Sequence, residues 1–170
     1  MADVRLRPWT ANDRPLLERT VGDPVLTRYL GGPESPQQIR ERHARYLRMG
    51  DADLGRMLVI LAGQDETPAG THGYWKRDDR TGGAIVWETG WFVLPHFQGQ
   101  GIATRATRLM AEMAWADAAD RPIHAYPAMD NGASNAVCRK VGFRLIGAFD
   151  FEYPPGHRLR CNDWVLEPRG

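Results

Sequence analysis

The polar and apolar positions near the N-terminus predict a strand followed by helices. Val4 to Arg7 alternates between apolar and charged side chains, as a half-buried strand does. Thr10 to Asp13 offers capping residues before the apolar Leu16, so a helix is predicted there. A second short helix is predicted over Pro24 to Leu30, and Gly31-Gly32-Pro33 is expected to end it.

The clearest helix signal is Ser35-Pro36-Gln37-Gln38. A serine followed three residues later by a glutamine is the pattern of a capping box, and the proline between them stands at the first helical position. Four residues then follow at helical spacing and predict one buried face, namely Ile39, His43, Tyr46 and Leu47. This helix is expected to run to about Met49.

The middle of the chain changes to the pattern of strands. Met57 to Leu61 is an unbroken apolar run, and Ala69 to Lys76 is a second strand candidate. Ile85 to Leu94 is a third, and Asp78 to Gly83 before it is predicted to form a hairpin turn. Strands separated by short turns predict an antiparallel meander.

The last part of the chain mixes helices and strands. Five residues predict one face of a helix, namely Ile102, Ala106, Leu109, Met110 and Met113. The remaining predicted elements are a strand at Ile123 to Tyr126, a helix at Asn131 to Val141, and closing strands at Arg144 to Phe151 and Leu159 to Leu166. The pattern predicts an α/β (α+β) fold, with a mixed, mostly antiparallel sheet flanked by helices. Residues 1–170 are expected to form a single domain.

Composition and charge exclude several classes of protein. Hydrophobic residues make up 42% and charged residues 25%, which is ordinary for a globular chain. The net charge of +1 argues against a dedicated nucleic-acid or membrane-surface protein. The two cysteines and five scattered histidines show no metal-ligand spacing, so no metal is expected. A cytoplasmic location and a monomer or homodimer are the expectations.

Candidate chemistry is concentrated between Leu94 and Thr104, where a strand ends, the chain turns on glycines and a helix begins. The first amides of a helix have no internal acceptor, and the helix dipole adds partial positive charge there. Small residues at Gly99, Gly101 and Ala103 allow close approach of a ligand to the backbone. This combination predicts a phosphate or pyrophosphate site.

Other readings of this loop remain open on the loop alone. The P-loop of nucleotide-binding proteins requires a Lys-Ser/Thr pair after its glycines, and this loop has none. Thr104 stands where a dinucleotide fingerprint has its third glycine. A tight strand-to-helix turn that binds nothing is the remaining alternative.

A second motif favours a ligand-binding loop over an empty turn. Gln98-x-x-Gly101-x-Ala103 is followed by Asn131-x-x-Ser134, and the next helix ends in Lys140-x-Gly142-Phe143. Together these motifs resemble the GNAT family of N-acetyltransferases. The resemblance covers Ile85 to Phe143 well, and Glu88 to Gly101 resembles most the branch of ribosomal-protein N-terminal alanine and serine acetyltransferases.

The resemblance implies a cofactor, acetyl-CoA or CoA, and residues that bind it. In the family the amides of the first motif hold the pyrophosphate, and the second motif faces the pantetheine arm. The cofactor-binding residues expected here are Phe92, Val93, Leu94, Gln98, Gly99, Gln100, Gly101, Ile102, Ala103, Thr104, Asn131, Ser134 and Cys138. The resemblance also implies that the strand splays near Gly90, and a glycine inside a strand predicts a bulge there.

Glu88 is the leading candidate for the catalytic base, since it lies mid-strand among aromatic residues. A carboxylate that faces solvent or holds an arginine is the alternative. Ser134 is the candidate donor to the leaving thiolate, or else a capping or pantetheine contact. Many family members have a tyrosine where this chain has Cys138. His124 and Tyr126 share one side of their strand, and line the acceptor site or belong to the core.

Two classes of function follow from this reading. The first is an acetyl-CoA-dependent N-acetyltransferase that moves an acetyl group directly to a primary amine, on a protein N-terminus or a small molecule. The second is a non-catalytic module that binds acyl-CoA and regulates a partner.

Overall fold

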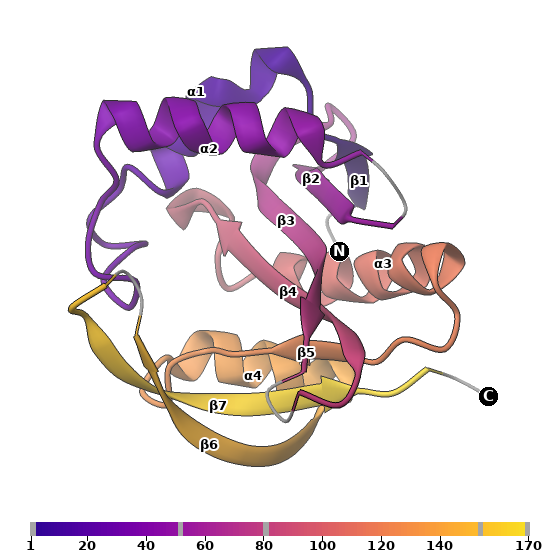
Figure 1. The fold of residues 1–170 in the computed structure, drawn as a ribbon. Coiled ribbons are helices and arrows are strands. Elements are labelled where there is room, and N and C mark those ends of the chain that lie inside the picture. Colours follow the sequence, from indigo (N-terminus) through magenta and orange to yellow (C-terminus); the bar gives the residue numbers. More distant parts are fainter. Residues whose placement is uncertain (1–2, 51–52, 80–81, 153–154, 169–170) are drawn as a thin grey trace.

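The computed structural model describes residues 3–50, 53–79, 82–152 and 155–168. Its elements follow the predicted order, with the strands in a single sheet (Figure 1). The helices are η1 (Ala11–Asp13), α1 (Arg14–Thr20), α2 (Pro36–Arg48), η2 (Pro95–Phe97), α3 (Ile102–Asp117) and α4 (Gly132–Val141). The strands are β1 (Val4–Pro8), β2 (Gly55–Ala62), β3 (Thr67–Asp78), β4 (Ile85–Val93), β5 (Ile123–Ala125), β6 (Arg144–Glu152) and β7 (Arg158–Leu166).

The strands lie in the order β1-β2-β3-β4-β5-β7-β6. Strands β1 to β4 form the predicted antiparallel meander, whereas β4 and β5 pair in parallel. A parallel pair needs a crossover connection, and α3 lies in that connection. The prediction of a mixed, mostly antiparallel sheet flanked by helices is therefore confirmed.

The sheet separates two layers of helices. Alternate residues of β2 face opposite layers: Met57 and Val59 pack with residues of α1 and α2, whereas Leu58 packs with residues of α3 and α4. This explains why β2 is an unbroken apolar run, because a strand covered on both faces has no side that favours polar residues. On β4, the Trp87 indole faces α3 and donates to the carbonyl of Ala114 at 3.2 Å.

The segment predicted as a helix over Pro24 to Leu30 forms turns instead. The Asp23 carboxylate accepts hydrogen bonds from the amides of Val25 and Leu26 at 2.8 and 2.9 Å. The amides of Leu30 and Gly32 then both reach the carbonyl of Thr27. A helix this short gains few backbone hydrogen bonds for the residues it orders, so local side-chain bonds decide the conformation.

The predicted N-terminus of α2 is confirmed. Ser35 caps the helix, and both hydrogen bonds of the capping box with Gln38 are present. The predicted buried face is wrong at Leu47, whose side chain is exposed, whereas Ile39 and Tyr46 are buried. A helix turns by about 100° per residue, so Leu47 lies roughly 80° around the axis from Ile39.

The predicted hairpin turn joins β3 to β4. The amide of Asp79 donates to the carbonyl of Ala84 at 2.7 Å, which closes the end of the hairpin. Arg80 and Thr81 of this turn lie outside the described residues.

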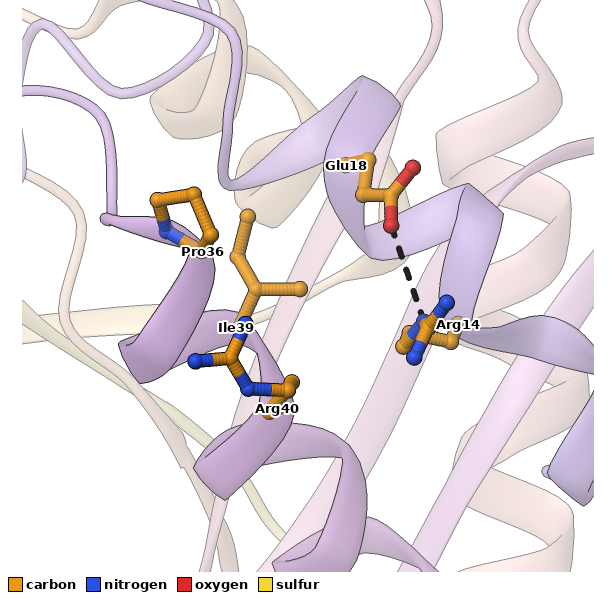
Figure 2. Close-up of a pocket in the computed structure, with 5 residues that line it drawn as sticks. All are labelled: Arg14, Glu18, Pro36, Ile39 and Arg40. Carbon is orange, nitrogen blue, oxygen red and sulfur yellow. Dashed lines mark ion pairs between the residues drawn. The ribbon is translucent and has the colours of Figure 1, made fainter.

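A shallow depression of about 190 Å³ lies between α1 and α2 (Figure 2). Its lining residues are Arg14, Glu18, Pro36, Ile39 and Arg40. Arg14 and Glu18 face each other across one turn of α1 at 3.6 Å, and both side chains are more than half exposed. Charges so exposed are screened by water, so this surface pair adds little to stability.

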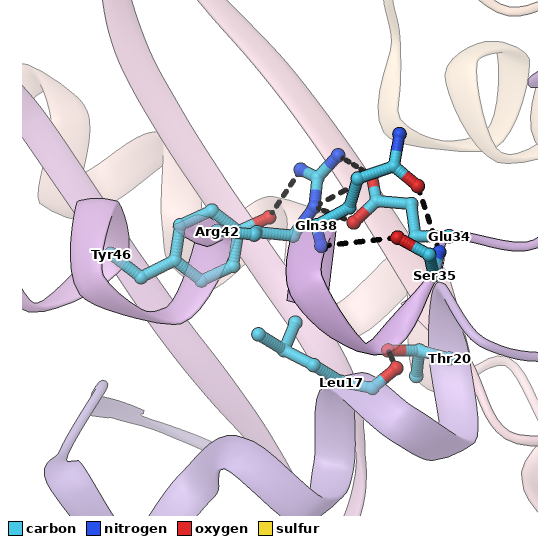
Figure 3. A network of polar contacts seen from close by, with 7 residues as sticks. All are labelled: Leu17, Thr20, Glu34, Ser35, Gln38, Arg42 and Tyr46. Carbon is cyan, nitrogen blue, oxygen red and sulfur yellow. Dashed lines mark hydrogen bonds and ion pairs between the residues drawn. The ribbon is translucent and has the colours of Figure 1, made fainter. Parts of the chain in front are cut away.

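A polar network fastens the end of the α1–α2 loop to α2 (Figure 3). The Nε of Arg42 donates to both carboxylate oxygens of Glu34 at 3.0 and 2.9 Å, and one terminal nitrogen donates to the Tyr46 hydroxyl. The side chains of Arg42 and Glu34 are only 15% and 18% exposed. Removing one partner therefore leaves the other charge poorly hydrated.

Glu34→Gln is expected to destabilise the fold by about 1–3 kcal/mol, because a half-buried guanidinium loses its countercharge. Urea unfolding followed by circular dichroism measures this change. Glu41→Gln is the matched control. Glu41 is exposed on α2, and among the described contacts its side chain bonds only to Gln37, one helical turn away. Equal midpoints for the two variants would contradict a structural role for the Glu34–Arg42 pair.

Candidate functional site

The sheet opens between β4 and β5. The two strands pair only where Trp87–Thr89 meets Ile123–Ala125. Beyond Thr89, the edge of Gly90–Val93 that faces β5 has no strand partner among the residues that the structure describes. This is the splay that the sequence predicted, and it leaves backbone amides and carbonyls of β4 available to a ligand.

Gly90 does not form the predicted bulge in the β3–β4 ladder. The register runs unbroken from Gly70↔Val93 to Asp78↔Ile85, with Gly73 opposite Gly90. A Cβ atom at Gly90 would lie 3.3 Å from the ring of Trp75. Glycine at this position therefore makes room for a tryptophan on the neighbouring strand, and the splay arises from the short pairing with β5.

The loop at the end of β4 leads into α3 through two left-handed glycines. Gly99 and Gly101 both have φ of 74°, a conformation that side chains with a Cβ adopt reluctantly. Gly101 is the N-cap of α3, and no side chain caps the helix. The amides of the first turn thus lack both an internal and a side-chain acceptor.

The surroundings of this loop leave space for a ligand. Apart from their chain neighbours, none of the described residues comes within 4 Å of the Cβ position of either Gly99 or Gly101. The Gln98 side chain donates from Nε2 to the carbonyl of Val93 at 2.8 Å, which ties the loop to the end of β4. The predicted pyrophosphate loop and the splayed strand edge are therefore adjacent.

The other predicted residues of the loop differ in what they can offer. Gln98, Gly99, Gln100 and Gly101 are exposed, and Ala103 and Thr104 are half-buried. Ile102 as a whole residue is 1% exposed and its side chain packs in the core, so its side chain is not available to a ligand. Arg105 donates to the carbonyl of Gln100 at 3.0 Å.

Helix α4 begins with the second predicted motif. The Asn131 side chain is its N-cap and accepts a hydrogen bond from the amide of Ser134 at 3.1 Å. The bond holds Ser134 in the first turn, where its side chain is half-buried. The cap of this helix is therefore the side chain of Asn131, and Ser134 contributes its amide to the cap.

Asn135 is a structural residue that the sequence reasoning missed. Its carboxamide oxygen accepts hydrogen bonds from Asn162 at 2.7 Å and from the Trp164 indole at 2.9 Å, both on β7. Its nitrogen donates to the carbonyls of Ala128 and Asn131 at 2.8 Å each. The available signal was a polar residue on the apolar face of α4, three positions before the buried Cys138.

Cys138 was expected at the cofactor, but the structure places it in the core. Its side chain is fully buried among residues of β2, α3 and β7. Burial raises the pKa of the thiol to about 12. The protonated thiol is a poor nucleophile, so an acyl-cysteine intermediate at this residue has no support.

One ion pair and one hydrogen-bonded histidine–aspartate pair lie on the face of the sheet opposite α3 and α4. Arg77 of β3 donates to a carboxylate oxygen of Glu88, whose side chain is 13% exposed. Asp163 of β7 lies 2.8 Å from Nδ1 of His124. Glu88 therefore does hold an arginine, as the alternative reading of the sequence proposed. Nothing local in the sequence pointed to Arg77 or Asp163.

The depression between α1 and α2 is separate from these groups. None of its lining residues belongs to the Gln98–Ala103 loop, β4 or β5. No helix in the described ranges is long and apolar enough to cross a membrane.

The chain and its fold are similar to known acetyltransferases. Residues 3–144 match the family model of the acetyltransferase (GNAT) domain. A search of curated proteins gave no significant match. A GNAT-family acetyltransferase from Bacillus anthracis has a TM-score of 0.80 at 16% sequence identity, with 98% of this chain and 96% of that chain covered.

Two further solved structures differ in what they act on. An acetyltransferase from Salmonella typhimurium modifies the N-terminal serine of ribosomal protein L7/L12; it has a TM-score of 0.78 at 22% identity and covers 98% of this chain and 95% of that chain. Spermidine N-acetyltransferase from Vibrio cholerae, in complex with CoA and spermine, has a TM-score of 0.77 at 14% identity, with 96% and 95% covered. These similarities confirm the predicted fold.

Proposed function

Because the chain belongs to the GNAT family of acetyltransferases and is an acetyl-CoA-dependent N-acetyltransferase, we propose that it transfers the acetyl group where β4 and β5 separate. The acceptor is a primary amine, on a protein N-terminus or a small molecule. When bound, acetyl-CoA supplies an acetyl thioester whose carbonyl carbon reacts with a neutral amine.

The uncapped start of α3 is the observation that carries this proposal. Gly99 and Gly101 leave open space where a side chain would otherwise stand, and the helix presents unpaired amides beside it. A pyrophosphate fits such a site because it accepts several hydrogen bonds and carries the charge that the helix dipole favours. The residues that hold it are Gln98, Gly99, Gln100, Gly101, Ile102, Ala103 and Thr104.

The open edge of β4 is the proposed site for the pantetheine arm. Phe92, Val93 and Leu94 follow the point where pairing with β5 ends, and the Gln98 loop adjoins them. Asn131 and Ser134 face the arm from the start of α4. An amide-containing chain bound to a strand edge reuses the hydrogen bonds that a neighbouring strand would make.

Glu88 is the proposed base, since one of its carboxylate oxygens holds Arg77 and the other accepts no hydrogen bond from the residues that the structure describes, so it can meet an ammonium group. Only Thr89 separates Glu88 from Gly90, where the opened edge begins. Ser134 is the proposed proton donor to the departing thiolate, because its place in the first turn of α4 is fixed by the Asn131 cap. A base and a donor on opposite sides of the reacting carbon are what direct acyl transfer to an amine requires.

A thiol-release assay tests the proposed function. The purified protein is mixed with acetyl-CoA and a panel of N-terminal peptides, polyamines, amino acids and aminoglycosides, and free CoA is measured. Turnover with a primary amine, and with no secondary or acetylated control, is the expected result. Tight CoA binding without turnover on any acceptor would support the regulatory module instead.

A further inference from the structure

His124 and Asp163 form a largely buried pair beside Glu88. Nδ1 of His124 lies 2.8 Å from Oδ1 of Asp163, and their side chains are 11% and 13% exposed. The two residues are separated by 39 positions in the sequence and meet because β5 pairs with β7. The pair is thus assembled by the sheet.

The pair lies on the same side of the sheet as Glu88. His124 is the register partner of Glu88 in the parallel ladder, and neighbouring strands lie about 4.8 Å apart. Trp87 and Ala125, the neighbours of these two residues in sequence, point to the opposite layer of α3 and α4. Glu88 and His124 therefore lie side by side, one residue pair before the last pair at which the strands still meet.

The carboxylate fixes which nitrogen of His124 carries hydrogen in the neutral ring. An ionised carboxylate only accepts hydrogen bonds, so Nδ1 must donate to Asp163. Nε2, on the far side of the ring, then has the lone pair and can accept a proton. Asp163 also stabilises the positive charge that the ring gains when it does so.

We infer that His124, oriented by Asp163, takes the second of the two protons that the acceptor nitrogen loses during acetyl transfer. The inference rests on the proposed function. Glu88 takes the first proton, which converts the ammonium to an amine whose lone pair attacks the thioester carbonyl. His124 is then a catalytic residue, and Asp163 is a positioning residue.

The second proton has a definite origin. When the C–N bond forms, the nitrogen carries a positive charge and one hydrogen too many for an amide. Nε2 of His124 takes this proton, the C–S bond breaks and the sulfur leaves with the electron pair. Ser134 passes a proton to the sulfur and regains one from solvent, and Glu88 and His124 return theirs to solvent. The balance is one ammonium and one thioester converted to one amide, one thiol and one proton.

The environment of His124 contains few other titratable groups. Those that share its face of the sheet include Arg77 of β3, Glu88 of β4, Arg144 of β6, Tyr126 directly after β5, and Cys161 and Asp163 of β7. Arg77 is paired with Glu88 and lies 5.9 Å from the ring centre of Tyr126. The ring of Tyr126 lies 5.9 Å from that of His124.

The test compares two variants over a range of pH. His124→Asn keeps a nitrogen donor for Asp163 but removes the basic nitrogen, and should lower kcat about a hundredfold with the KM for acetyl-CoA unchanged. Above the pKa of the acceptor amine, the Glu88→Gln loss should shrink because the first proton is already gone. The His124→Asn loss should persist there, because the second proton is still present.

Further variants separate this role from a structural one. His157→Asn, the same change in the β6–β7 turn, should keep full activity. Asp163→Asn should lower kcat less than His124→Asn, and NMR of the ring nitrogens should show hydrogen on Nδ1 in the wild type and a mixture of tautomers in Asp163→Asn. If His124→Asn does not fold, His124→Gln with Asp163→Asn carries the test.

Each result has a definite meaning. Wild-type kcat in a folded His124→Asn protein would overturn the inference, as would a loss that vanishes at high pH in parallel with that of Glu88→Gln. Both outcomes leave wild-type acetyl transfer intact and so contradict this inference alone. A wild type without turnover on the whole acceptor panel would contradict the proposed function and this inference together.

Discussion

Glu88→Gln is expected to lower turnover by about a hundredfold to ten-thousandfold at neutral pH, the usual loss when a general base is removed. The change is nearly isosteric, and the amide oxygen can still accept the hydrogen bond from Arg77 that the carboxylate accepts now. Affinity for CoA should therefore stay close to that of the wild type. Steady-state kinetics and calorimetric titration with CoA measure the two effects separately.

The pH dependence of this loss identifies the role of Glu88. As pH rises, more of the acceptor is already a neutral amine, so the first deprotonation no longer needs a base. The loss should fall near pH 8 for an α-amino acceptor and only above about pH 10 for a lysine-like amine. The same profile thus indicates the class of acceptor.

Glu112→Gln is the matched control, since it makes the same change at an exposed position of α3. It should keep wild-type turnover. If Glu88→Gln loses activity equally at every pH, Glu88 positions the acceptor, and an ordered water becomes the better candidate for the first proton. Wild-type turnover in Glu88→Gln would remove Glu88 from the mechanism.

Gly101→Asp is expected to weaken CoA binding by about a hundredfold or more without unfolding the protein. The new carboxylate would stand at the start of α3, against the pyrophosphate, and like charges placed together cost several kcal/mol. Apart from the chain neighbours, none of the described residues comes within 4 Å of the new Cβ, so the folded protein itself has room for the side chain. Calorimetry with CoA, alongside circular dichroism, measures affinity and folding.

Gly101→Ala separates charge from backbone strain. Gly101 has φ of 74°, where alanine is strained by about 1–2 kcal/mol and aspartate by less. The alanine variant should therefore keep most of the affinity, although it is the more strained of the two. Equal affinity of wild type and Gly101→Asp would show that the loop is only a turn. ATP and NAD should bind the wild type far more weakly than CoA if the whole site selects the cofactor.

Local patterns alone were enough for the elements that begin or end with strong signals. The Ser35–Gln38 capping box located the start of α2, and Gly142 at φ of 107° ends α4 as predicted. The Gln98–Ala103 loop was also readable, because the conformation of Gly101 and the uncapped first turn depend on a few consecutive residues. Such features are determined by short-range sterics and hydrogen bonds, which sequence reports directly.

Local patterns failed where neighbouring side chains decide the outcome. Asp23 binds the amides that follow it and leaves Pro24 to Leu30 as turns. Gly90 faces Trp75 on β3 and needs no bulge, and Cys138 sits in the core where a ligand contact was expected. The sequence offered the right residue types at these positions but not their partners.

The surroundings of Glu88 and His124 also show which features sequence determines and which depend on tertiary structure. The sequence by itself determined the family, the glycine loop that we propose for the cofactor and the choice of Glu88 as a candidate base. Only the tertiary structure brought Arg77 to Glu88 and Asp163 to His124, because these contacts join different strands across 11 and 39 residues. Which carboxylate meets which cation depends on strand order and register, and those are set by packing of the whole sheet between its helices.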